Sequence, residues 1–356
     1  MACACLIEGD PLEEARALMD CGCAAEAAAV LRERLAAGRG GALARITLVE
    51  ALLQAGDGPG ALAEAREASS LHPNIGVTLM WFGVALMAEG QLPAAIAELQ
   101  RALRLDPESR EARQFLARAW LNAGEADKAL EALQYADNDD LRAEAEAIKA
   151  APRSDPRYVR HLFDQFSADY DRRMRENLSY AAPEMLRDLF GLVLPGREGL
   201  SILDLGCGTG LAGELFRPLA RRMEGVDLSP AMIGKARERN IYDHLAVADI
   251  ETLLALDGPA YDLILAADTL VYLGDLAPVF SGAAARLAPE GCFLFTVERA
   301  EGDGYELGPK RRWRHGETYL RDLAQQAGFA VAGLVAAAPR REAGVPVDGF
   351  AVALVR

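Results

Sequence analysis

Hydrophobic and small residues recur every 34 positions through the first 150 residues of the chain. Glycine and alanine keep this spacing, and a large apolar residue lies four positions before each glycine. The members of the pattern are Gly56, Gly90 and Gly124; Ala61, Ala95 and Ala129; Ala68, Ala102 and Ala136; and Leu52, Leu86 and Trp120. Pro73 and Pro107 share one phase, and Leu18, Gly22 and Ala27 extend the pattern backwards. Glycine at a turn, alanine where helices approach closely and proline beyond a helix end predict repeated helix pairs.

Residues 1–150 therefore resemble a tetratricopeptide-repeat domain, with repeats at about 40–73, 74–107 and 108–141 and a degenerate unit before residue 40. The resemblance implies an all-α solenoid whose groove binds a peptide or a partner protein. The alternative is that the repeats only cap or dimerise the other domain. A polar stretch at 137–140, a charged helix and residues 151–156 are expected to form the linker.

From residue 200 onward, short apolar runs alternate with helix-like segments. Strands are expected at 201–205, 223–226, 245–248, 261–266, 292–297, 330–335 and 350–355. This alternation predicts an α/β Rossmann-like domain with a mostly parallel seven-stranded sheet, which binds its ligand at the carboxyl ends of the strands.

The stretch ILDLGCGTGLAGELF, residues 202–216, can be read in two glycine registers. Gly208, Gly210 and Gly213 fit the G-x-G-x-x-G turn of dinucleotide enzymes, whereas Gly206, Gly208 and Gly210 fit G-x-G-x-G directly after a strand. A pyrophosphate would be repelled by the carboxylate of Asp204, at a cost on the order of a few kcal/mol in a low-dielectric cleft. The sulfonium and ammonium groups of S-adenosylmethionine would be attracted. We therefore predict the second register, with Gly213 packed close to the sheet.

Two more acids follow predicted strands. Asp227 ends the second strand, where a carboxylate can accept hydrogen bonds from both ribose hydroxyls of either cofactor. Asp249 follows the third strand, placed to accept from an adenine amino group. Ser229 and Pro230 predict the N-cap and first position of the next helix.

Residues 155–356 thus resemble a class I S-adenosylmethionine-dependent methyltransferase, and the whole chain resembles the bacterial members with N-terminal tetratricopeptide repeats. The resemblance implies S-adenosyl-L-methionine as cofactor and S-adenosyl-L-homocysteine as product. It also implies that Asp204 supports the methionine end, Asp227 the ribose and Asp249 the adenine. Further residues expected at the cofactor are Gly206, Gly208, Gly210, Leu228, Met232, Ile250, Asp268 and Tyr170.

Methyl transfer from a sulfonium needs a base only when the nucleophile arrives protonated. His72 and His244 are expected to be structural, which leaves His161 and His315 as catalytic candidates, together with Tyr272 near the sulfonium. His315 lies in a basic run at 310–320 and is predicted to be a base or a substrate anchor, with Arg314 as a clamp for an anionic group. The alternative is a solvated loop whose histidine caps the following helix.

The aromatic segment 155–180 resembles the lid that small-molecule methyltransferases fold over the cofactor. Tyr170 is predicted to close this lid, and Phe166, Tyr180 and Tyr305 to contact the substrate. The alternative for Phe163 and Phe166 is that they only pack helices onto the sheet. No Asn/Asp-Pro-Pro-Tyr motif follows the fourth strand, which disfavours methylation of a DNA base or a glutamine.

Composition narrows the possible partners. A chain of 356 residues with a net charge of −15 is long enough for two domains and too acidic for a nucleic-acid binder or a polybasic membrane anchor. It has no run of 18 apolar residues, and its first residues lack a basic region, so a cytoplasmic protein is expected. Cys3, Cys5, Cys21 and Cys23 form two C-x-C pairs, expected to pack between helices rather than bind zinc, and no metal site is predicted.

The function predicted from these observations is methyl transfer to an oxygen, carbon or nitrogen of a small-molecule or carrier-bound acceptor, with the repeats recruiting a partner or carrier protein. Two alternatives remain open. The substrate is a protein side chain held by the repeats, or the chain is a non-catalytic cofactor-binding scaffold or assembly factor.

Overall fold

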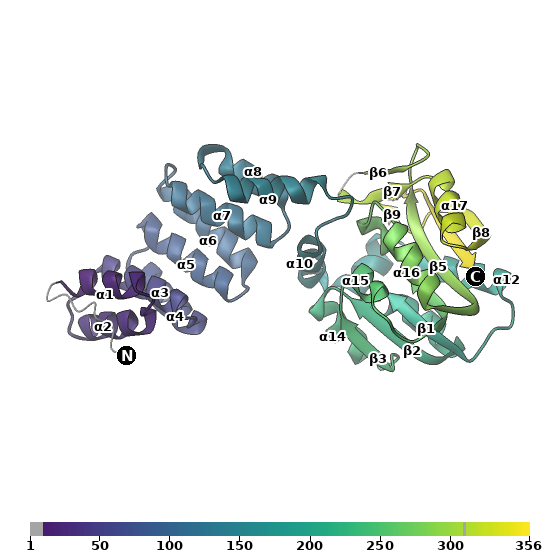
Figure 1. Cartoon of the computed structure of the whole chain (residues 1–356), viewed down its shortest axis with the longest axis horizontal. Coiled ribbons are helices and arrows are strands. Elements are labelled where there is room, and N and C mark those ends of the chain that lie inside the picture. The colour runs from purple at the N-terminus through teal and green to yellow at the C-terminus, as the bar shows by residue number, and fades with distance from the viewer. Residues whose placement is uncertain (1–9, 309–310) are drawn as a thin grey trace. The chain divides into compact units, whose positions relative to one another are not determined.

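The computed structural model describes residues 10–308 and 311–356, and the chain divides into two compact units, residues 1–150 and 151–356 (Figure 1). Cys3 and Cys5 lie outside the described residues. Among the described residues, Cys21 is exposed and Cys23 partly exposed, and neither forms a disulfide.

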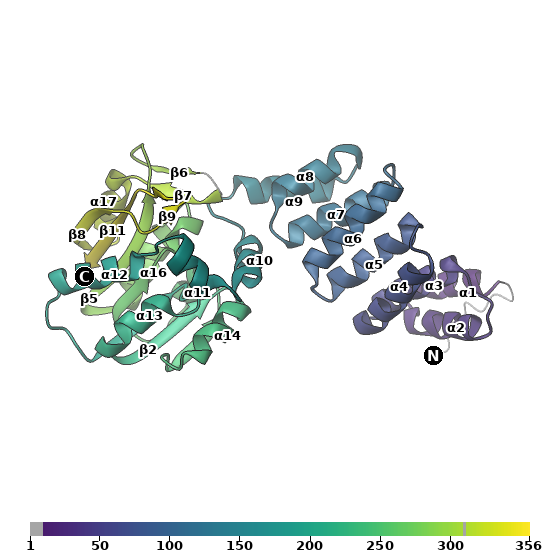
Figure 2. The ribbon, with the colours of Figure 1, turned by 180° about the vertical axis from the view of Figure 1, so that it is seen from behind.

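The first unit is a row of antiparallel helices (Figure 2). Its elements are α1 Pro11–Asp20, α2 Ala24–Ala36, α3 Ala42–Gln54, α4 Gly58–Leu71, α5 Gly76–Ala88, α6 Leu92–Leu105, α7 Arg110–Asn122, α8 Ala126–Ala132, the 3₁₀ turn η1 Leu133–Tyr135 and α9 Asp139–Ala150. Each predicted repeat coincides with one helix pair, and α1 with α2 forms the pair before residue 40.

The 34-residue period has a direct structural cause. Gly22, Gly56, Gly90 and Gly124 all have φ between 70° and 78°, a left-handed conformation that lets each chain turn from one helix into the next. The alanines at both phases are buried, with 2% exposure or less, because larger side chains would hold paired helices apart.

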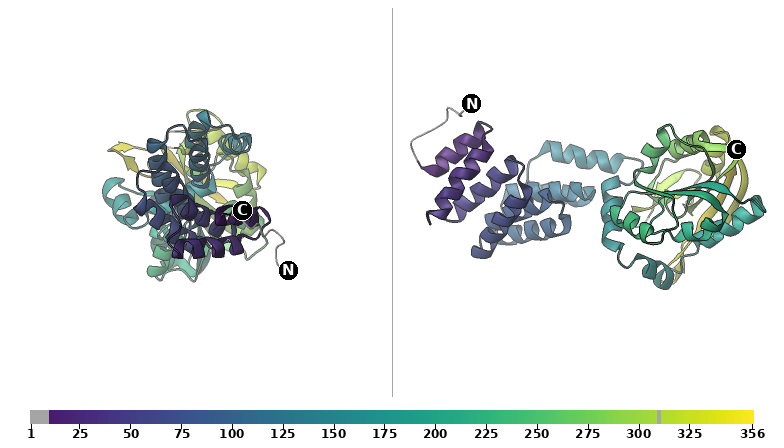
Figure 3. Two further views of the ribbon diagram at one scale, coloured as in Figure 1. Left: turned by 90° about the vertical axis from the view of Figure 1, so that its left-hand side faces the viewer. Right: turned by 90° about the horizontal axis from the view of Figure 1, so that it is seen from below.

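The second unit is a sheet with helices on both faces (Figure 3). Its seven long strands are β1 Leu200–Leu205, β2 Ala220–Asp227, β3 His244–Val247, β4 Tyr261–Ala266, β5 Leu287–Arg299, β8 Ala330–Ala337 and β11 Gly349–Val355. They lie in the order β3-β2-β1-β4-β5-β11-β8, parallel from β3 to β5, with β11 antiparallel to both its neighbours. The fold class predicted from the sequence is confirmed.

Helices cover this sheet in two apolar layers. One layer includes α15 Ile250–Ala255, α16 Ala277–Arg286 and α17 Glu317–Gln326, and the other includes α12 Ala182–Val193 and α13 Leu211–Phe216. The remaining elements are α10 Pro156–Phe166, α11 Tyr170–Arg172, the π-helical turn η2 Arg173–Asn177, η3 Arg217–Leu219, α14 Pro230–Glu238 and η4 Leu270–Tyr272.

The structure contains four short strands that the sequence analysis does not predict. β6 Tyr305–Leu307 and β7 Trp313–His315 extend the main sheet beside the end of β5, and β9 Arg341–Glu342 pairs with β10 Val345–Pro346 in a separate hairpin. Strands of two or three residues, rich in charged side chains, are too short for an alternating pattern to be visible.

Candidate cofactor and acceptor site

A cavity opens where β1, β2 and β4 end, and we call it the main cavity. The carboxyl ends of these parallel strands meet at one edge, as expected for this topology. Its lining residues are Arg153, Ser154, Val159, Phe163, Tyr170, Gly206, Gly208, Asp227, Leu228, Asp249, Ile250, Ala267, Asp268, Thr269, Tyr272 and Leu273. Eight of the predicted cofactor residues are among them; Asp204, Gly210 and Met232 are not.

The turn after β1 follows the G-x-G-x-G register. Gly206 comes directly after the strand with φ 67°, and a Cβ there would lie 2.4 Å from Thr269. A Cβ built at Gly208 would meet only the Tyr170 ring, at 4.0 Å, so a ligand can approach the backbone. Gly213 is tightly packed as predicted, but its close neighbour is Tyr242 rather than the sheet, and a Cβ at Gly213 would lie 2.1 Å from the Tyr242 hydroxyl.

Asp204 lies behind this turn, in an inner pocket that shares Tyr170, Gly206, Gly208 and Ala267 with the main cavity. Its side chain is 1% exposed and accepts a hydrogen bond of 2.7 Å from the Tyr242 hydroxyl. Burial raises the pKa of Asp204 to about 7, and the nearby carboxylate of Asp227 adds to this rise. A cation bound next to Asp204 would relieve both effects.

Asp227 ends β2 with both carboxylate oxygens engaged by the backbone. The N–H of Gly208 donates to Oδ2 at 2.9 Å, and the N–H of Ser229 donates to Oδ1 at 2.8 Å. Burial raises the pKa of this carboxyl to about 6. Each oxygen keeps a lone pair, so the side chain is held in place and can still accept hydrogen bonds from a ligand hydroxyl. Ser229 caps α14 through Met232 N–H, and Pro230 is the first residue of the helix.

Asp249 caps α15 and pairs with Arg153, an arginine that is not among the residues predicted to bind the cofactor. Its Oδ1 accepts from the N–H of Thr252 at 3.0 Å, and its Oδ2 accepts from Nη2 of Arg153 at 2.6 Å. Partial burial raises the pKa of Asp249, but the hydrogen bonds from Arg153 and Thr252 outweigh it and hold that pKa below its usual value. The carboxylate is therefore charged at neutral pH.

The segment predicted as a lid lies over this edge of the sheet. Asp164 of α10 accepts from the Ser229 hydroxyl at 2.5 Å, and Asp171 of α11 accepts from the Thr209 hydroxyl at 2.5 Å. Arg239 also pairs with Asp171. Tyr170, between these contacts, lines the main cavity and the inner pocket. Asp164 and Asp171 thus connect the predicted lid segment to the N-cap of α14 and to the glycine turn.

A second cavity lies next to the main one, and we call it the outer cavity. Phe163, Tyr170, Asp268 and Tyr272 line both cavities, so they form the boundary between the two. Burial and the carboxylate of Asp268 raise the pKa values of Tyr170 and Tyr272, so both phenols stay protonated at neutral pH.

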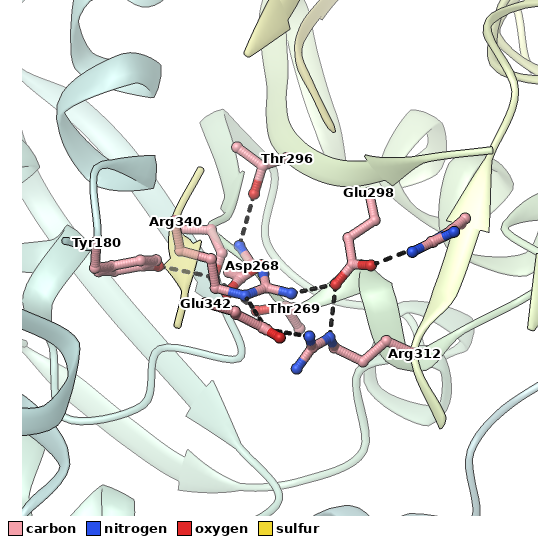
Figure 4. Close-up of polar contacts among 10 residues, drawn as sticks. Tyr180, Asp268, Thr269, Thr296, Glu298, Arg312, Arg340 and Glu342 are labelled. Atoms are coloured by element: carbon pink, nitrogen blue, oxygen red, sulfur yellow. Dashed lines mark hydrogen bonds and ion pairs between the residues drawn. The ribbon is translucent and has the colours of Figure 1, made fainter. Parts of the chain in front are cut away.

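Ion pairs form one wall of the outer cavity (Figure 4). Arg340, which is 2% exposed, donates to Asp268, Glu298 and Glu342, residues that lie at the ends of β4 and β5 and in β9. Arg312 donates to Glu298 at 2.6 Å and also to Glu342. Burial raises the pKa of Asp268, and Arg340 opposes that rise.

The two predicted histidines do not reach either cavity. His315 is fully buried in β7, its Nε2 lies 3.1 Å from the carbonyl oxygen of Gly274, and burial lowers its pKa to about 4. It is not solvated and lines none of the cavities at this edge of the sheet, so its position does not support the predicted role of base or substrate anchor. His161 contacts Gln165 at 2.6 Å on α10 and is not among the residues that line the two cavities. His72, after α4, and His244, at the start of β3, have the structural positions expected for them.

Of the four predicted substrate residues, Phe166 and Tyr180 line cavities at this edge of the sheet, whereas Arg314 and Tyr305 do not. Phe166 lines the outer cavity, where Arg173 stacks on its ring at 4.5 Å, and Tyr180 lines the inner pocket. Arg314 instead lies 3.6 Å from Glu298 and lines a separate groove, and Tyr305 packs against Trp313 and Tyr319. Neither Arg314 nor Tyr305 lines the main cavity or the outer cavity.

Sequence reasoning missed four residues that shape the site: Arg153, Tyr242, Arg312 and Arg340. An arginine or a tyrosine in a loop carries no motif. Arg153 lies in residues 151–156, which the sequence analysis assigns to the linker, so no binding role is predicted for it.

Comparisons with known proteins match two stretches of the chain. Residues 166–333 match the family described as a methyltransferase domain, and residues 86–151 match the tetratricopeptide repeat. Human methyltransferase-like protein 27 is 34% identical over 113 residues, which cover 31% of this chain and 45% of that protein. The malonyl-[acyl-carrier protein] O-methyltransferase of Serratia marcescens is 30% identical over 165 residues, covering 46% and 60%.

Among solved structures, the magnesium protoporphyrin IX methyltransferase of Synechocystis with bound S-adenosylmethionine is 19% identical, covers 56% of this chain and 96% of its own, and has a TM-score of 0.44. The chain spans about half the length of the curated relatives it matches.

Among the described residues, no helix is both long and apolar enough to cross a membrane. The chain thus joins a stretch that matches the tetratricopeptide repeat to a stretch that matches a methyltransferase domain.

Proposed function

We propose that the protein transfers a methyl group from S-adenosylmethionine to a small-molecule or carrier-bound acceptor. The observation that carries this proposal is the pair of adjoining cavities with a shared boundary of Phe163, Tyr170, Asp268 and Tyr272. A methyl donor in the main cavity would face an acceptor in the outer cavity across this boundary, which is the arrangement that an in-line displacement needs.

The charges of the main cavity support this cofactor over a dinucleotide. Asp204 and Asp227 are buried carboxylates with raised pKa values, and they would be stabilised by a sulfonium and an ammonium group. Arg153 is the only basic residue among the described ones that line the main cavity, and it is already paired with Asp249 and Glu251. A pyrophosphate would therefore find no free cation among these lining residues.

The bound cofactor supplies an electrophilic methyl group, and the chain supplies alignment and exclusion of water. Asp227 would hold the ribose, Asp249 the adenine amino group and Asp204 the methionine end. The aromatic side chains of Phe163, Tyr170 and Tyr272 would exclude water from the reacting atoms. The protonated phenols of Tyr170 and Tyr272 can donate hydrogen bonds but cannot act as bases.

Asp268 replaces the histidines as the candidate proton acceptor. It lies at the boundary of the two cavities, and its raised pKa makes it a better base than an exposed aspartate. An acceptor hydroxyl or amine that arrives protonated would lose its proton to this carboxylate as the methyl group is transferred. An acceptor that arrives deprotonated would need only alignment.

The relatives favour an oxygen nucleophile. The Serratia protein is named as an enzyme of malonyl-[acyl-carrier protein], and a Rhodopseudomonas palustris protein that is 32% identical over 99 residues is named as a ubiquinone biosynthesis O-methyltransferase. A carrier-bound acceptor would also give the repeats a role, because a solenoid of this kind binds protein partners.

The test is release of S-adenosylhomocysteine by the full chain, measured by mass spectrometry with three acceptor panels: free hydroxy and carboxylic acids, acyl groups on a carrier protein, and unmodified proteins. Asp227→Ala serves as the control that should lose cofactor binding. We expect release with the first or second panel. Release with proteins alone would instead favour a protein methyltransferase. Binding of the cofactor without release in any panel would favour a scaffold.

A further inference from the structure

The segment between the repeats and the sheet is built into the wall of the main cavity. The carbonyl oxygen of Pro152 accepts from the N–H groups of Gly274 and Asp275 at 2.9 and 3.0 Å, and the N–H of Ser154 donates to the Tyr272 carbonyl at 2.8 Å. Arg153 forms an isolated β-bridge with Leu273. This pairing fixes the backbone of Arg153 against residues that themselves line the cavity.

Gly274 makes this close approach possible. A Cβ at this position would lie 2.9 Å from the Pro152 carbonyl oxygen and 2.7 Å from the ring of Trp313. Any other residue would push the segment away from η4. The position of Arg153 is therefore specified by backbone contacts and does not depend on its own side chain.

The side chain of Arg153 meets two carboxylates. Nη2 donates to Oδ2 of Asp249 at 2.6 Å, and Nη1 donates to Glu251. The other oxygen of Asp249 is held by the N–H of Thr252 at 3.0 Å. The helix cap thus fixes one carboxylate oxygen and Arg153 fixes the other, so the plane of the carboxylate is set from both sides.

Arg153 also balances the local charge. Asp249 and Glu251 are two acids at the start of one short helix, each with a side chain that is 17% exposed, and both pair with this one guanidinium. Without Arg153 the two carboxylates would repel each other next to the cavity, and Asp249 could relieve the repulsion by taking up a proton or turning away.

We propose that Arg153 determines the selectivity of the site for an amino purine, by holding Asp249 ionised and oriented as an acceptor. An exocyclic amino group can donate to this carboxylate, whereas a 6-oxo group would place an oxygen against it and be repelled. This inference rests on the proposed function, because it requires that the adenosyl group binds in the main cavity. Arg153 acts through Asp249 and is a positioning residue.

The test compares S-adenosyl-L-homocysteine with S-inosyl-L-homocysteine, which has an oxygen in place of the adenine amino group, by calorimetric binding to the full chain. Arg153→Met keeps the length of the side chain and removes its charge. We expect it to weaken binding of the adenosyl ligand at least tenfold and to change binding of the inosyl ligand less than threefold. The preference of the site for the adenosyl over the inosyl ligand would then fall more than threefold.

Arg217→Met is the matched control, because Arg217 pairs with Asp243 at 2.7 Å and lines none of the three cavities. It should leave both affinities unchanged. Arg153→Gln, which keeps donors without the charge, gives the same test if the methionine variant does not fold, with the ratio expected to fall at least threefold.

A variant of Arg153 that folds and keeps the wild-type ratio of affinities overturns the inference. A wild-type chain that binds neither ligand overturns the proposed function itself, and this result is distinguishable because it does not depend on any substitution.

Discussion

The hydroxyl of Tyr242 donates a hydrogen bond of 2.7 Å to Oδ2 of Asp204, where Asp204 is buried and Tyr242 is partly buried. The ring of Tyr242 also fills the space next to Gly210, Gly213 and Gly225, each of which would place a Cβ within 3.1 Å of it. One tyrosine therefore supports the acid of the first strand and packs against three glycines at once.

Tyr242→Phe keeps this packing and removes the hydrogen bond. The buried carboxyl of Asp204 loses its donor, so we expect a loss of about 1–3 kcal/mol in stability and a several-fold weaker affinity for S-adenosylhomocysteine, measured by calorimetry. Tyr261→Phe is the control, because the Tyr261 hydroxyl donates to Glu224 at 3.2 Å at the start of β4, away from the main cavity. A Tyr242→Phe chain that binds the ligand like the wild type would show that Asp204 needs no such support.

The raised pKa values of Asp204 and Asp227 predict a pH dependence for the chain without cofactor. Below about pH 4 these carboxyls are protonated in both the folded and the unfolded state. As the pH rises through about 6 and 7, the unfolded acids are already ionised while the buried ones resist ionisation, so the stability they contribute is lost.

Asp204→Asn isolates this effect, because asparagine does not titrate. Relative to the wild type, we expect the variant to become more stable by about 1–3 kcal/mol between pH 5 and pH 8. Hydrogen exchange of β1 and β2 measures the stability of this domain within the full chain. A difference between variant and wild type that stays constant with pH would mean that Asp204 titrates normally.

Gly206 should not tolerate a side chain. Gly206→Ala would place a methyl group 2.4 Å from Thr269 in a left-handed backbone conformation, so we expect a loss of about 1–3 kcal/mol and of ligand binding. Gly234→Ala is the matched control, since Gly234 lies inside α14 with no atom within 4 Å of a Cβ, and it should stabilise the domain by about 0.5–1 kcal/mol. Thermal denaturation of the two variants checks this contrast, and equal effects would refute it.

The lid depends on Asp171. Asp171→Asn weakens the contacts to Thr209 and Arg239, so we expect faster hydrogen exchange over residues 156–176 and faster dissociation of S-adenosylhomocysteine, by about threefold to tenfold, in stopped-flow measurements. Asp169→Asn is the control, because Asp169 is exposed and pairs within one turn with Arg172. The same exchange rates in both variants would show that this acid does not hold the lid.

Arg340 should be the least replaceable arginine in the domain. Arg340→Met leaves the carboxylates of Asp268, Glu298 and Glu342 without their shared partner, and we expect a loss of about 3–5 kcal/mol. Arg341→Met, on the neighbouring exposed position where the side chain donates to the Gly344 carbonyl, should cost less than about 1 kcal/mol. Chemical denaturation of both variants tests this. Adding Glu298→Gln to Arg340→Met removes one of the unpaired carboxylates and should recover part of the lost stability. If it recovers none, the loss comes from packing rather than from charge.

The sequence by itself determined the features that depend on short stretches of chain. The 34-residue period specifies helix pairs because each glycine turn lies between two adjacent helices. The acids Asp204, Asp227 and Asp249 could be placed at one edge because parallel strands bring their carboxyl ends together whatever the details of packing. The glycine register is a prediction from the sign of the neighbouring charge, that of Asp204.

Only the tertiary structure decided which charges meet. Asp268 and Arg340 are 72 residues apart, and Asp204 and Tyr242 are 38 apart, and no local pattern links either pair. His315 resembled a catalytic residue in a basic loop, yet the short strand β7 buries it completely against Gly274. The cost of burying a polar side chain depends on its final surroundings, and these form only when distant segments fold together.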